Sequence, residues 1–259
     1  MTLGPEEFLL GGRVAVVSGA AAGIGRAVAQ AFARFGADLG LCDRDGEGLS
    51  SLAKELAPAQ VVTSVLDVRR REETGAFVEE VARRFGRIDV LVNNAGGGFA
   101  SPFERLSPRA QDALIAENFT AVADLTRQCL PWMGDGASIV NVTSIEAHRA
   151  GPGYSVYSAM KAAVASLTKT LALELGGRGI RVNCIAPDVI PTPGVGGEEG
   201  LGPVRTPLDR RGRPEDVAAA AVYLASPAAG FVTGTTIHVD GGNLAAGGWR
   251  RRADGSFST

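Results

Sequence analysis

The sequence predicts an α/β protein with a doubly wound, parallel, seven-stranded sheet and helices on both of its faces. Short runs rich in β-branched residues alternate along the chain with longer segments that repeat apolar residues every three or four positions. Strands that alternate with helices form parallel sheets, because right-handed crossovers place helices on either face. No stretch of linker composition divides the 259 residues, so we expect a single domain, with a core over residues 11–242 and a C-terminal extension over residues 243–259.

The individual elements follow from these patterns. Buried strands are expected over residues 13–17, 39–42, 60–65, 88–92, 138–142, 180–185 and 235–239. Helical periodicity predicts helices over residues 24–35, 72–85, 107–130, 154–175 and 214–224. Residues 191–206 are rich in Pro and Gly and have little periodicity. Such an insert is typical of a lid or binding loop, and its glycines favour mobility before a ligand binds.

Composition excludes several classes of protein. A net charge of −2 with 45% apolar and 21% charged residues describes a globular chain without the basic surface that nucleic acids require. The scattered cysteines Cys42, Cys129 and Cys184 predict free, buried thiols in a reducing compartment, and neither a disulfide framework nor a metal site. No run approaches the roughly 20 apolar residues that cross a bilayer. We therefore expect a cytoplasmic protein with no membrane, nucleic-acid or metal partner.

The turn after the first strand predicts a dinucleotide site. Residues 18–25 carry Gly19, Gly23 and Gly25 between that strand and the first helix. Glycines there allow a tight turn and close approach of the backbone to a pyrophosphate, which the helix N-terminus also attracts. This pattern is typical of the phosphate-binding turn of the Rossmann fold. A glycine motif that only forms a turn remains the alternative.

Residues after the second strand bear on the choice of cofactor. Asp43 lies about 20 residues beyond the glycine motif, where a carboxylate hydrogen-bonds the ribose 2′-hydroxyl of NAD. The turn itself holds Ala21 and Ala22 and offers no cation to a 2′-phosphate. Arg44 argues the other way, because its guanidinium could pair with such a phosphate. NAD is favoured over NADP, and a helix N-cap or turn role for Asp43 stays open.

Five motifs in order resemble those of the short-chain dehydrogenase/reductase family over about residues 11–242. They are the glycine turn at residues 18–25, with Ser18 in place of Thr; the NNAG of residues 93–96; Asn118; Ser144 at the end of the fifth strand; and the YxxxK pair Tyr157 and Lys161. The closing stretches at residues 213–217 and 232–242 are also similar. The resemblance implies an oxidoreductase with Asn118, Ser144, Tyr157 and Lys161 as its catalytic residues.

The spacing of the YxxxK pair makes chemical sense by itself. Tyr157 and Lys161 are four residues apart, so on a helix they share one face. An ammonium there would lower the tyrosine pKa from about 10, and the phenol could then exchange a proton with a substrate oxygen. Ser144, on a strand end, could hydrogen-bond that oxygen. A solvated surface pair is the alternative for the tyrosine and lysine.

The resemblance also assigns cofactor contacts. Lys161 would bind the nicotinamide ribose, Asn118 would hold a water of a proton relay, and Asp67 with Val68 would contact the adenine side. The cofactor-binding set it implies is Gly19, Ala22, Gly23, Ile24, Gly25, Asp43, Arg44, Asp67, Val68, Asn94, Ala95, Gly96, Pro187, Ile190 and Thr192, together with Tyr157 and Lys161. One position departs from the family: Asp188 stands where a Gly usually follows the Pro. It could be a turn acid, a hydrogen-bond acceptor or a substrate-selecting charge.

These motifs do not identify the substrate. By analogy, the variable wall of the pocket comes from residues 97–101, 146–154 and 191–206, and few cations are expected there, which favours a mostly apolar alcohol. His148 is expected to be solvated rather than catalytic. The resemblance implies a homotetramer through the helices near residues 107–130 and 154–175, although their apolar residues would equally suit burial on the sheet. The tail, with Trp249 beside three arginines, could pack on a neighbouring subunit or rim a pocket.

Three functions follow, from two classes. The first is an NAD-dependent oxidoreductase that interconverts a secondary alcohol and a ketone. The second is an NADPH-dependent 3-oxoacyl-thioester (acyl-carrier-protein) reductase, against which Ala21, Ala22 and Asp43 count. The third is a dinucleotide-binding protein without turnover, against which the complete set of four catalytic residues counts.

Overall fold

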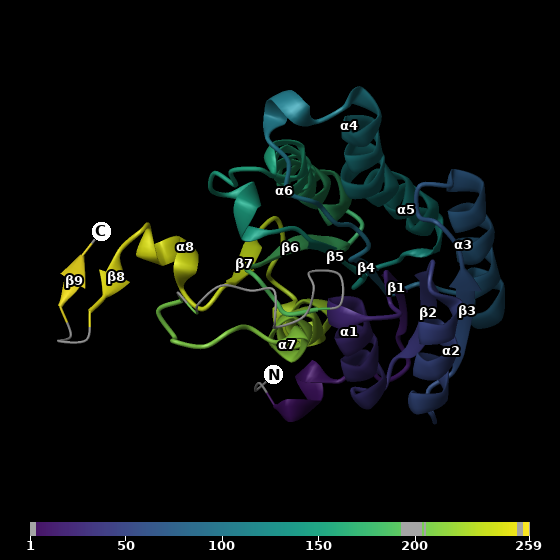
Figure 1. Ribbon diagram of the computed structural model, residues 1–259. Coiled ribbons are helices and arrows are strands. Elements are labelled where there is room, and N and C mark those ends of the chain that lie inside the picture. Colours follow the sequence, from purple (N-terminus) through teal and green to yellow (C-terminus); the bar gives the residue numbers. More distant parts are fainter. Residues whose placement is uncertain (1–3, 193–203, 205, 253–255, 259) are drawn as a thin grey trace.

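Parallel strands form the central sheet of the protein, in the order β3-β2-β1-β4-β5-β6-β7 (Figure 1). The computed structural model describes residues 4–192, 204, 206–252 and 256–258. The predicted seven-stranded, doubly wound α/β fold is confirmed, and most expected strand limits hold to within one or two residues. The strands are β1 (Val14–Ser18), β2 (Asp38–Asp43), β3 (Val61–Val65), β4 (Val90–Asn93), β5 (Ser138–Val142), β6 (Arg181–Pro187) and β7 (Thr236–Val239).

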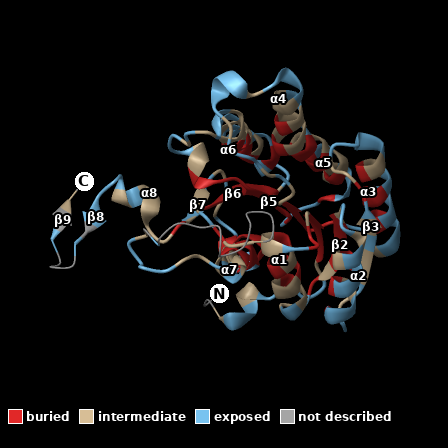
Figure 2. Cartoon of the chain, viewed as in Figure 1, coloured by how far each residue is buried: buried red, intermediate tan, exposed pale blue. Residues whose placement is uncertain are grey.

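The core lies on both faces of this sheet. Successive strand residues point to opposite faces, so Ala15 and Val17 of β1 join one buried cluster and Val14 and Val16 join the other. All five residues of β1 are buried, as expected of a strand covered on both sides. Figure 2 shows the central strands of the sheet as the buried layer, with exposed residues on the outer surfaces of the helices.

Helices cover the two faces in separate layers (Figure 1). One layer holds α1 (Gly23–Arg34), α2 (Gly46–Glu55) and α7 (Pro214–Ala225), whose side chains enter the first cluster. The other holds α3 (Arg71–Phe85), α4 (Pro108–Ile115), α5 (Ala121–Cys129) and α6 (Ser155–Gly176). Local chemistry sets several of their ends. Asp45 caps α2 by accepting from Gly48 N, Ser107 caps α4 by accepting from Ala110 N, and Gly86 ends α3 at φ +79°.

The helix expected over residues 107–130 is interrupted. Residues Ala116–Thr120 form a π-helical turn between α4 and α5, and a 3₁₀ turn, Leu130–Trp132, follows α5. The amide of Asn118 lies at the π turn and donates to the carbonyl oxygens of Leu114 and Gly97, at 3.0 and 2.9 Å. Periodicity cannot predict this interruption, because it depends on a bond to a distant loop. Single-turn π segments of this kind often mark functional sites.

Some elements were not expected from the sequence. These are α2, the short 3₁₀ segments Pro5–Phe8, Phe103–Arg105, Ile145–Ala147 and Pro227–Ala229, and the C-terminal elements α8 (Asn243–Ala246), β8 (Arg250–Arg251) and β9 (Phe257–Ser258). The antiparallel β8–β9 pair stands away from the main sheet (Figure 1). Of the predicted insert at residues 191–206, residues 193–203 and 205 lie outside the described part of the chain. The glycines from which mobility was predicted are among them.

Strand order places the site. The chain moves outward from β1 to β2 and β3, then returns to the other side of β1 with β4. At such a reversal the loops after the two central strands diverge and leave a crevice at the carboxyl edge of the sheet, where α/β proteins bind ligands. The three cysteines are free and buried, as predicted. Among the described helices, none is long and apolar enough to cross a membrane.

Candidate active site

The glycine turn between β1 and α1 has room for backbone only. Gly19 and Gly23 have φ of +66° and +56°, which side chains other than glycine rarely adopt. A Cβ on Gly25 would lie 2.0 Å from the carbonyl oxygen of Gly19. The turn therefore requires glycine at all three positions that the sequence singled out.

The start of α1 is suited to an anion. Its N-cap, Ala22, makes no side-chain capping hydrogen bond, so the first amides of the helix are not satisfied in that way. A 12-residue helix also places a partial positive charge at this end. Together with the glycine cradle, these amides fit the pyrophosphate of a dinucleotide.

Two later segments close on this turn. Asn94 Nδ2 donates to the carbonyl oxygens of Ser18 and Gly19, both at 3.0 Å, and the amides of Asn94 and Ala95 donate to Ser18 Oγ at 3.1 Å. A Cβ on Gly23 would meet Thr192 Cγ2 at 2.9 Å. The loop after β4 and the residues after β6 therefore both lie against the glycine turn, as the predicted cofactor set requires.

The end of β2 places Asp43 beside the same turn. One carboxylate oxygen accepts from Ala21 N at 2.9 Å and the other from Asp45 N at 3.1 Å. Asp43 thus orients the turn, while Asp45 rather than Asp43 caps the helix. The neighbouring Arg44 extends the other way, to within 3.7 Å of Glu117 Oε1 in the π turn. Sequence reasoning missed Glu117, whose approach to β2 is visible only in three dimensions.

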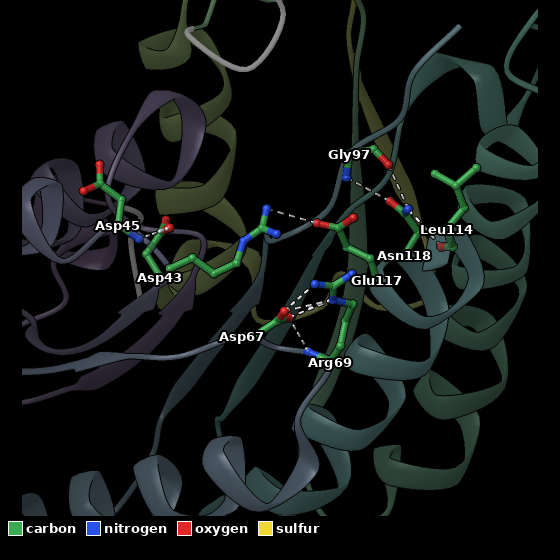
Figure 3. Close-up of polar contacts among 9 residues, drawn as sticks. Asp43, Asp45, Asp67, Arg69, Gly97, Leu114, Glu117 and Asn118 are labelled. Carbon is green, nitrogen blue, oxygen red and sulfur yellow. Dashed lines mark hydrogen bonds and ion pairs between the residues drawn. The ribbon is translucent and has the colours of Figure 1, made fainter. Parts of the chain in front are cut away.

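A second arginine lies at this end of the crevice (Figure 3). Arg69 binds Asp67 through both its Nε and its Nη2, and this pairing lowers the pKa of Asp67 to about 2. Val68 is half-buried and packs on the core cluster below. Both arginines at the expected adenine end are thus engaged by carboxylates, Arg44 by Glu117 and Arg69 by Asp67.

Three of the four predicted catalytic residues, Asn118, Tyr157 and Lys161, converge on the loop after β4. Asn118 is fully buried and binds both backbone groups of Gly97, its Oδ1 accepting from the amide at 3.2 Å. A Cβ on Gly96 would lie 2.8 Å from Asn118 Oδ1 and 3.2 Å from Lys161 Nζ. The two side chains therefore meet at Gly96.

Tyr157 lies against the next part of this loop. A Cβ on Gly98 would lie 2.9 Å from Tyr157 Cδ2, and Lys161 Nζ is 5.6 Å from the centre of the phenol ring. Lys161 is buried and donates to the carbonyl oxygen of Val142, at the end of β5, at 3.0 Å. The predicted sharing of one helix face by Tyr157 and Lys161 is therefore realised on α6, and the pair is not a solvated surface pair.

The pKa of Tyr157 does not follow the expected direction. Burial raises it to about 12, Glu146 and Tyr154 add to the rise, and hydrogen bonding with Ser144 opposes it. Burial also lowers the pKa of Lys161 to about 8, with Cys184 and Glu117 opposing. The phenol pKa is therefore raised rather than lowered, and desolvation by burial is the largest cause.

Charged residues form the described wall next to Ser144. Ser144 Oγ donates to Glu146 Oε2, Arg149 Nη2 lies 3.2 Å from Glu146 Oε1, and the same guanidinium lies 3.4 Å from Asp188 Oδ1. Asp188 Oδ2 accepts from Asn243 Nδ2 at 2.6 Å. Asp188 is thus a hydrogen-bond acceptor, and its backbone does not adopt the left-handed conformation that a family glycine would allow. In these contacts one cation, Arg149, lies between two carboxylates, so the described wall is charged although it holds few cations.

Pro187 and Ile190 are buried at the end of β6, and Ile24 packs on the core. His148 lies against His238 of β7, with ring centres 4.7 Å apart, and not against Ser144 or Tyr157 in any described contact.

Comparisons with known proteins match this geometry. A family model described as enoyl-(acyl carrier protein) reductase matches residues 19–243. A solved short-chain dehydrogenase/reductase, glucose/ribitol dehydrogenase of Brucella melitensis, superposes with a TM-score of 0.86 at 37% identity, over 90% of this chain and 97% of that one. This chain belongs to the short-chain dehydrogenase/reductase family. The resemblance found in the sequence is confirmed.

Two curated members of the short-chain dehydrogenase/reductase family show its range. The chain is 42% identical to 3-oxoacyl-(acyl-carrier-protein) reductase FabG of Thermotoga maritima, over 90% of this chain and 98% of the relative. It is 38% identical to D-threitol dehydrogenase of Mycolicibacterium smegmatis, over 91% of this chain and 94% of the relative. The protein is therefore an oxidoreductase, of a family that uses a nicotinamide dinucleotide.

Proposed function

We propose that this short-chain dehydrogenase/reductase transfers a hydride between NAD(H) and a secondary alcohol or ketone. One observation carries the proposal: Asn118, Lys161 and Tyr157 close around residues 96–98, directly beyond the Asn94 side chain that is bonded to the glycine turn. Proton-transfer groups and a dinucleotide cradle thus share one loop.

Each side chain has a task in this reaction. Tyr157 takes the proton of the carbinol during oxidation and returns it during reduction. Ser144, which hydrogen-bonds Tyr157, orients the substrate oxygen. Lys161 donates one of its three N–H bonds to Val142, which leaves two for ribose hydroxyls and for proton transfer. Asn118 holds the loop through Gly97, and its remaining oxygen lone pair can accept from a relay water.

The cofactor supplies the redox chemistry when bound, as the hydride acceptor or donor. The glycine turn and the N-terminus of α1 would hold its pyrophosphate, and Asp43 a ribose hydroxyl. Asp67 and Val68 would flank the adenine. Thr192, which lies over Gly23, would meet the carboxamide with Ile190 and Pro187.

The charge arrangement favours NAD over NADP. A 2′-phosphate beside Asp43 would meet a carboxylate, and residues 21 and 22 supply no cation. Arg44 and Arg69 are cations near the adenine end, and each is already paired with a carboxylate. A phosphate would have to displace Glu117 or Asp67 to recruit one of them.

The runner-up is an NADPH-dependent 3-oxoacyl-thioester reductase, favoured by the 42% identity to FabG of Thermotoga maritima. The charged wall at Glu146, Arg149 and Asp188 counts against a purely apolar substrate, and the relatives named for D-threitol and glucose/ribitol favour a polar alcohol. A dinucleotide-binding protein without turnover is the least favoured, since all four catalytic residues are present.

Steady-state assays decide between these functions. A panel of secondary alcohols with NAD or NADP, and acetoacetyl thioesters with NADH or NADPH, would be followed by absorbance of the reduced nicotinamide. We expect the highest kcat/KM with an alcohol and NAD. A preference for the thioester with NADPH would establish the runner-up, and binding of dinucleotide without turnover of any substrate would establish the third function.

We also propose that residues 11–242 form one catalytic domain that acts in the cytoplasm and assembles as a homotetramer. Three buried free thiols suit a reducing compartment. Leu173 of α6 is 86% exposed and Trp249 is 57% exposed, so α6 and the C-terminal extension offer apolar contacts to a partner. Light scattering of the full chain and of a chain that ends at Ala246 would measure the mass. Unchanged mass and Michaelis constants after truncation would exclude a role of the extension.

A further inference from the structure

The Ser144 hydroxyl is engaged by a carboxylate in this structure. Ser144 begins the 3₁₀ turn Ile145–Ala147, which folds Glu146 back over it. Its Oγ donates to Glu146 Oε2 and accepts from Glu146 N at 3.3 Å. Glu146 also raises the pKa of Tyr157, so its charge faces the phenol as well as the hydroxyl.

Glu146 is held in this place from several sides. Arg149 Nη2 lies 3.2 Å from its other oxygen, and a Cβ on Gly151 would lie 2.8 Å from Glu146 Cγ, so the backbone at Gly151 lies close to the side chain. Asp188 pairs with the same guanidinium, which gives two carboxylates for one cation and a net charge of −1. The side chain of Glu146 is 21% exposed. It therefore forms a fixed, negatively charged part of the wall.

A serine hydroxyl has one proton to donate. To donate a hydrogen bond to a reacting oxygen, the Ser144 hydroxyl must give up the hydrogen bond that it donates to Glu146. A partly buried carboxylate that loses a charge-assisted hydrogen bond is left unsatisfied, which is costly. A substrate that offers Glu146 a replacement donor removes this cost, whereas one with a single hydroxyl does not.

We propose that Glu146 accepts a hydrogen bond from a second hydroxyl on the carbon next to the reacting carbinol, so that the substrate is a neutral vicinal diol or its α-hydroxy ketone. The inference rests on the proposed alcohol oxidation. The two oxygens of a vicinal diol can lie as close together as Ser144 Oγ and a hydrogen-bonded partner do. One oxygen then takes the Ser144 proton while its neighbour satisfies Glu146. The net negative charge disfavours anionic substrates.

Matched alcohols test the proposal. Initial rates with NAD would be compared for 2,3-butanediol and 2-butanol, and for trans-1,2-cyclohexanediol and cyclohexanol. Each pair matches a vicinal diol with the alcohol that lacks its second hydroxyl, and the second pair is larger than the first. We expect kcat/KM to favour the diol about 10- to 100-fold in each pair that turns over. In Glu146→Ala the ratio of kcat/KM for the diol to that for the monohydric alcohol falls close to one. The diol loses its hydrogen-bond acceptor, and the monohydric alcohol no longer has to displace Glu146 from the Ser144 hydroxyl. Glu80→Ala, at an exposed position of α3, should keep the preference.

Two further measurements separate specificity from structural damage. Binding of each diol to the protein with NADH, read by NADH fluorescence, should weaken in Glu146→Ala while binding of NADH alone is unchanged. The rising limb of the pH profile for oxidation, where Tyr157 must be deprotonated, should move to lower pH, because Glu146 raises the pKa of Tyr157. The other groups that face this phenol, Ser144, Tyr154 and Lys161, are left intact. If Glu146→Ala does not fold, Glu146→Gln keeps the size without the charge and should show a reduced diol preference.

The outcomes are distinct. An equal diol preference in wild type and in the folded Glu146 variants, or no preference in wild type, would overturn this inference and leave alcohol oxidation standing. No turnover of any alcohol with either dinucleotide would overturn the proposed function, and this inference with it.

Discussion

The guanidinium of Arg44 lies 3.7 Å from the carboxylate of Glu117 and joins the end of β2 to the π turn that carries Asn118 (Figure 3). The same carboxylate acts on Arg69 and on Lys161, whose pKa values it raises. Glu117 therefore links the adenine end of the crevice to the catalytic end. The side chain of Arg44 is 64% exposed, so a ligand can compete for it.

This ion pair predicts a change of cofactor preference. In Glu117→Gln, Arg44 is free to bind a 2′-phosphate, and the ratio of kcat/KM for NADP to that for NAD should rise about 10-fold. Steady-state rates with both cofactors measure it. Adding Arg44→Ala to the variant should cancel the gain, and an unchanged ratio in Glu117→Gln would show that Arg44 does not meet the phosphate.

Removal of the Tyr157 hydroxyl tests proton transfer. Tyr157→Phe keeps the ring against Gly98 and over Lys161 but removes the acid–base group. We expect kcat to fall by about 10²- to 10⁴-fold. NADH binding, measured by fluorescence titration, should change less than about twofold, since the other cofactor contacts remain. Turnover at the wild-type rate would contradict the assignment.

The buried ammonium of Lys161 predicts a pH-dependent stability. Its pKa is about 8 in the fold against 10.5 unfolded, so between these values the unfolded state binds more protons and stability rises with pH. Below pH 8 the buried charge costs up to about 3 kcal/mol. Lys161→Met should therefore raise the free energy of unfolding at pH 7 while abolishing turnover.

Urea unfolding of both proteins at several pH values measures this difference. The advantage of Lys161→Met should shrink as the pH rises from 8 to 10.5, because over that range the wild-type lysine is mostly neutral in the fold but still protonated in the unfolded chain. A difference independent of pH would mean that packing, and not the charge, sets the stability of the variant.

The close contact within the glycine turn predicts the effect of one methyl group. In Gly25→Ala the added Cβ would lie 2.0 Å from Gly19 O, so the turn must open. We expect a loss of about 1–3 kcal/mol in the free energy of unfolding, with weaker NADH binding. Gly176→Ala near the end of α6, where nothing lies within 4 Å, should instead stabilise by about 0.5–1 kcal/mol. Equal effects of the two substitutions would show that crowding at Gly25 is not the cause.

By itself, the sequence determined the alternation of strands and helices, the glycine turn at residues 18–25 and the shared face of Tyr157 and Lys161. These features depend on near neighbours along the chain, whose periodicity and spacing are visible without the fold. Local patterns did not predict the interruption of the helix expected over residues 107–130. There Asn118 forms hydrogen bonds with Gly97, which is distant in the sequence.

Only the tertiary structure decided which charges meet. Arg149 reaches Asp188, and Arg44 reaches Glu117, because the strand order brings loops from distant parts of the sequence to one edge of the sheet. The direction of the Tyr157 pKa was likewise decided there. Spacing places an ammonium near a phenol, but burial depends on everything packed around them, and here desolvation is the larger effect.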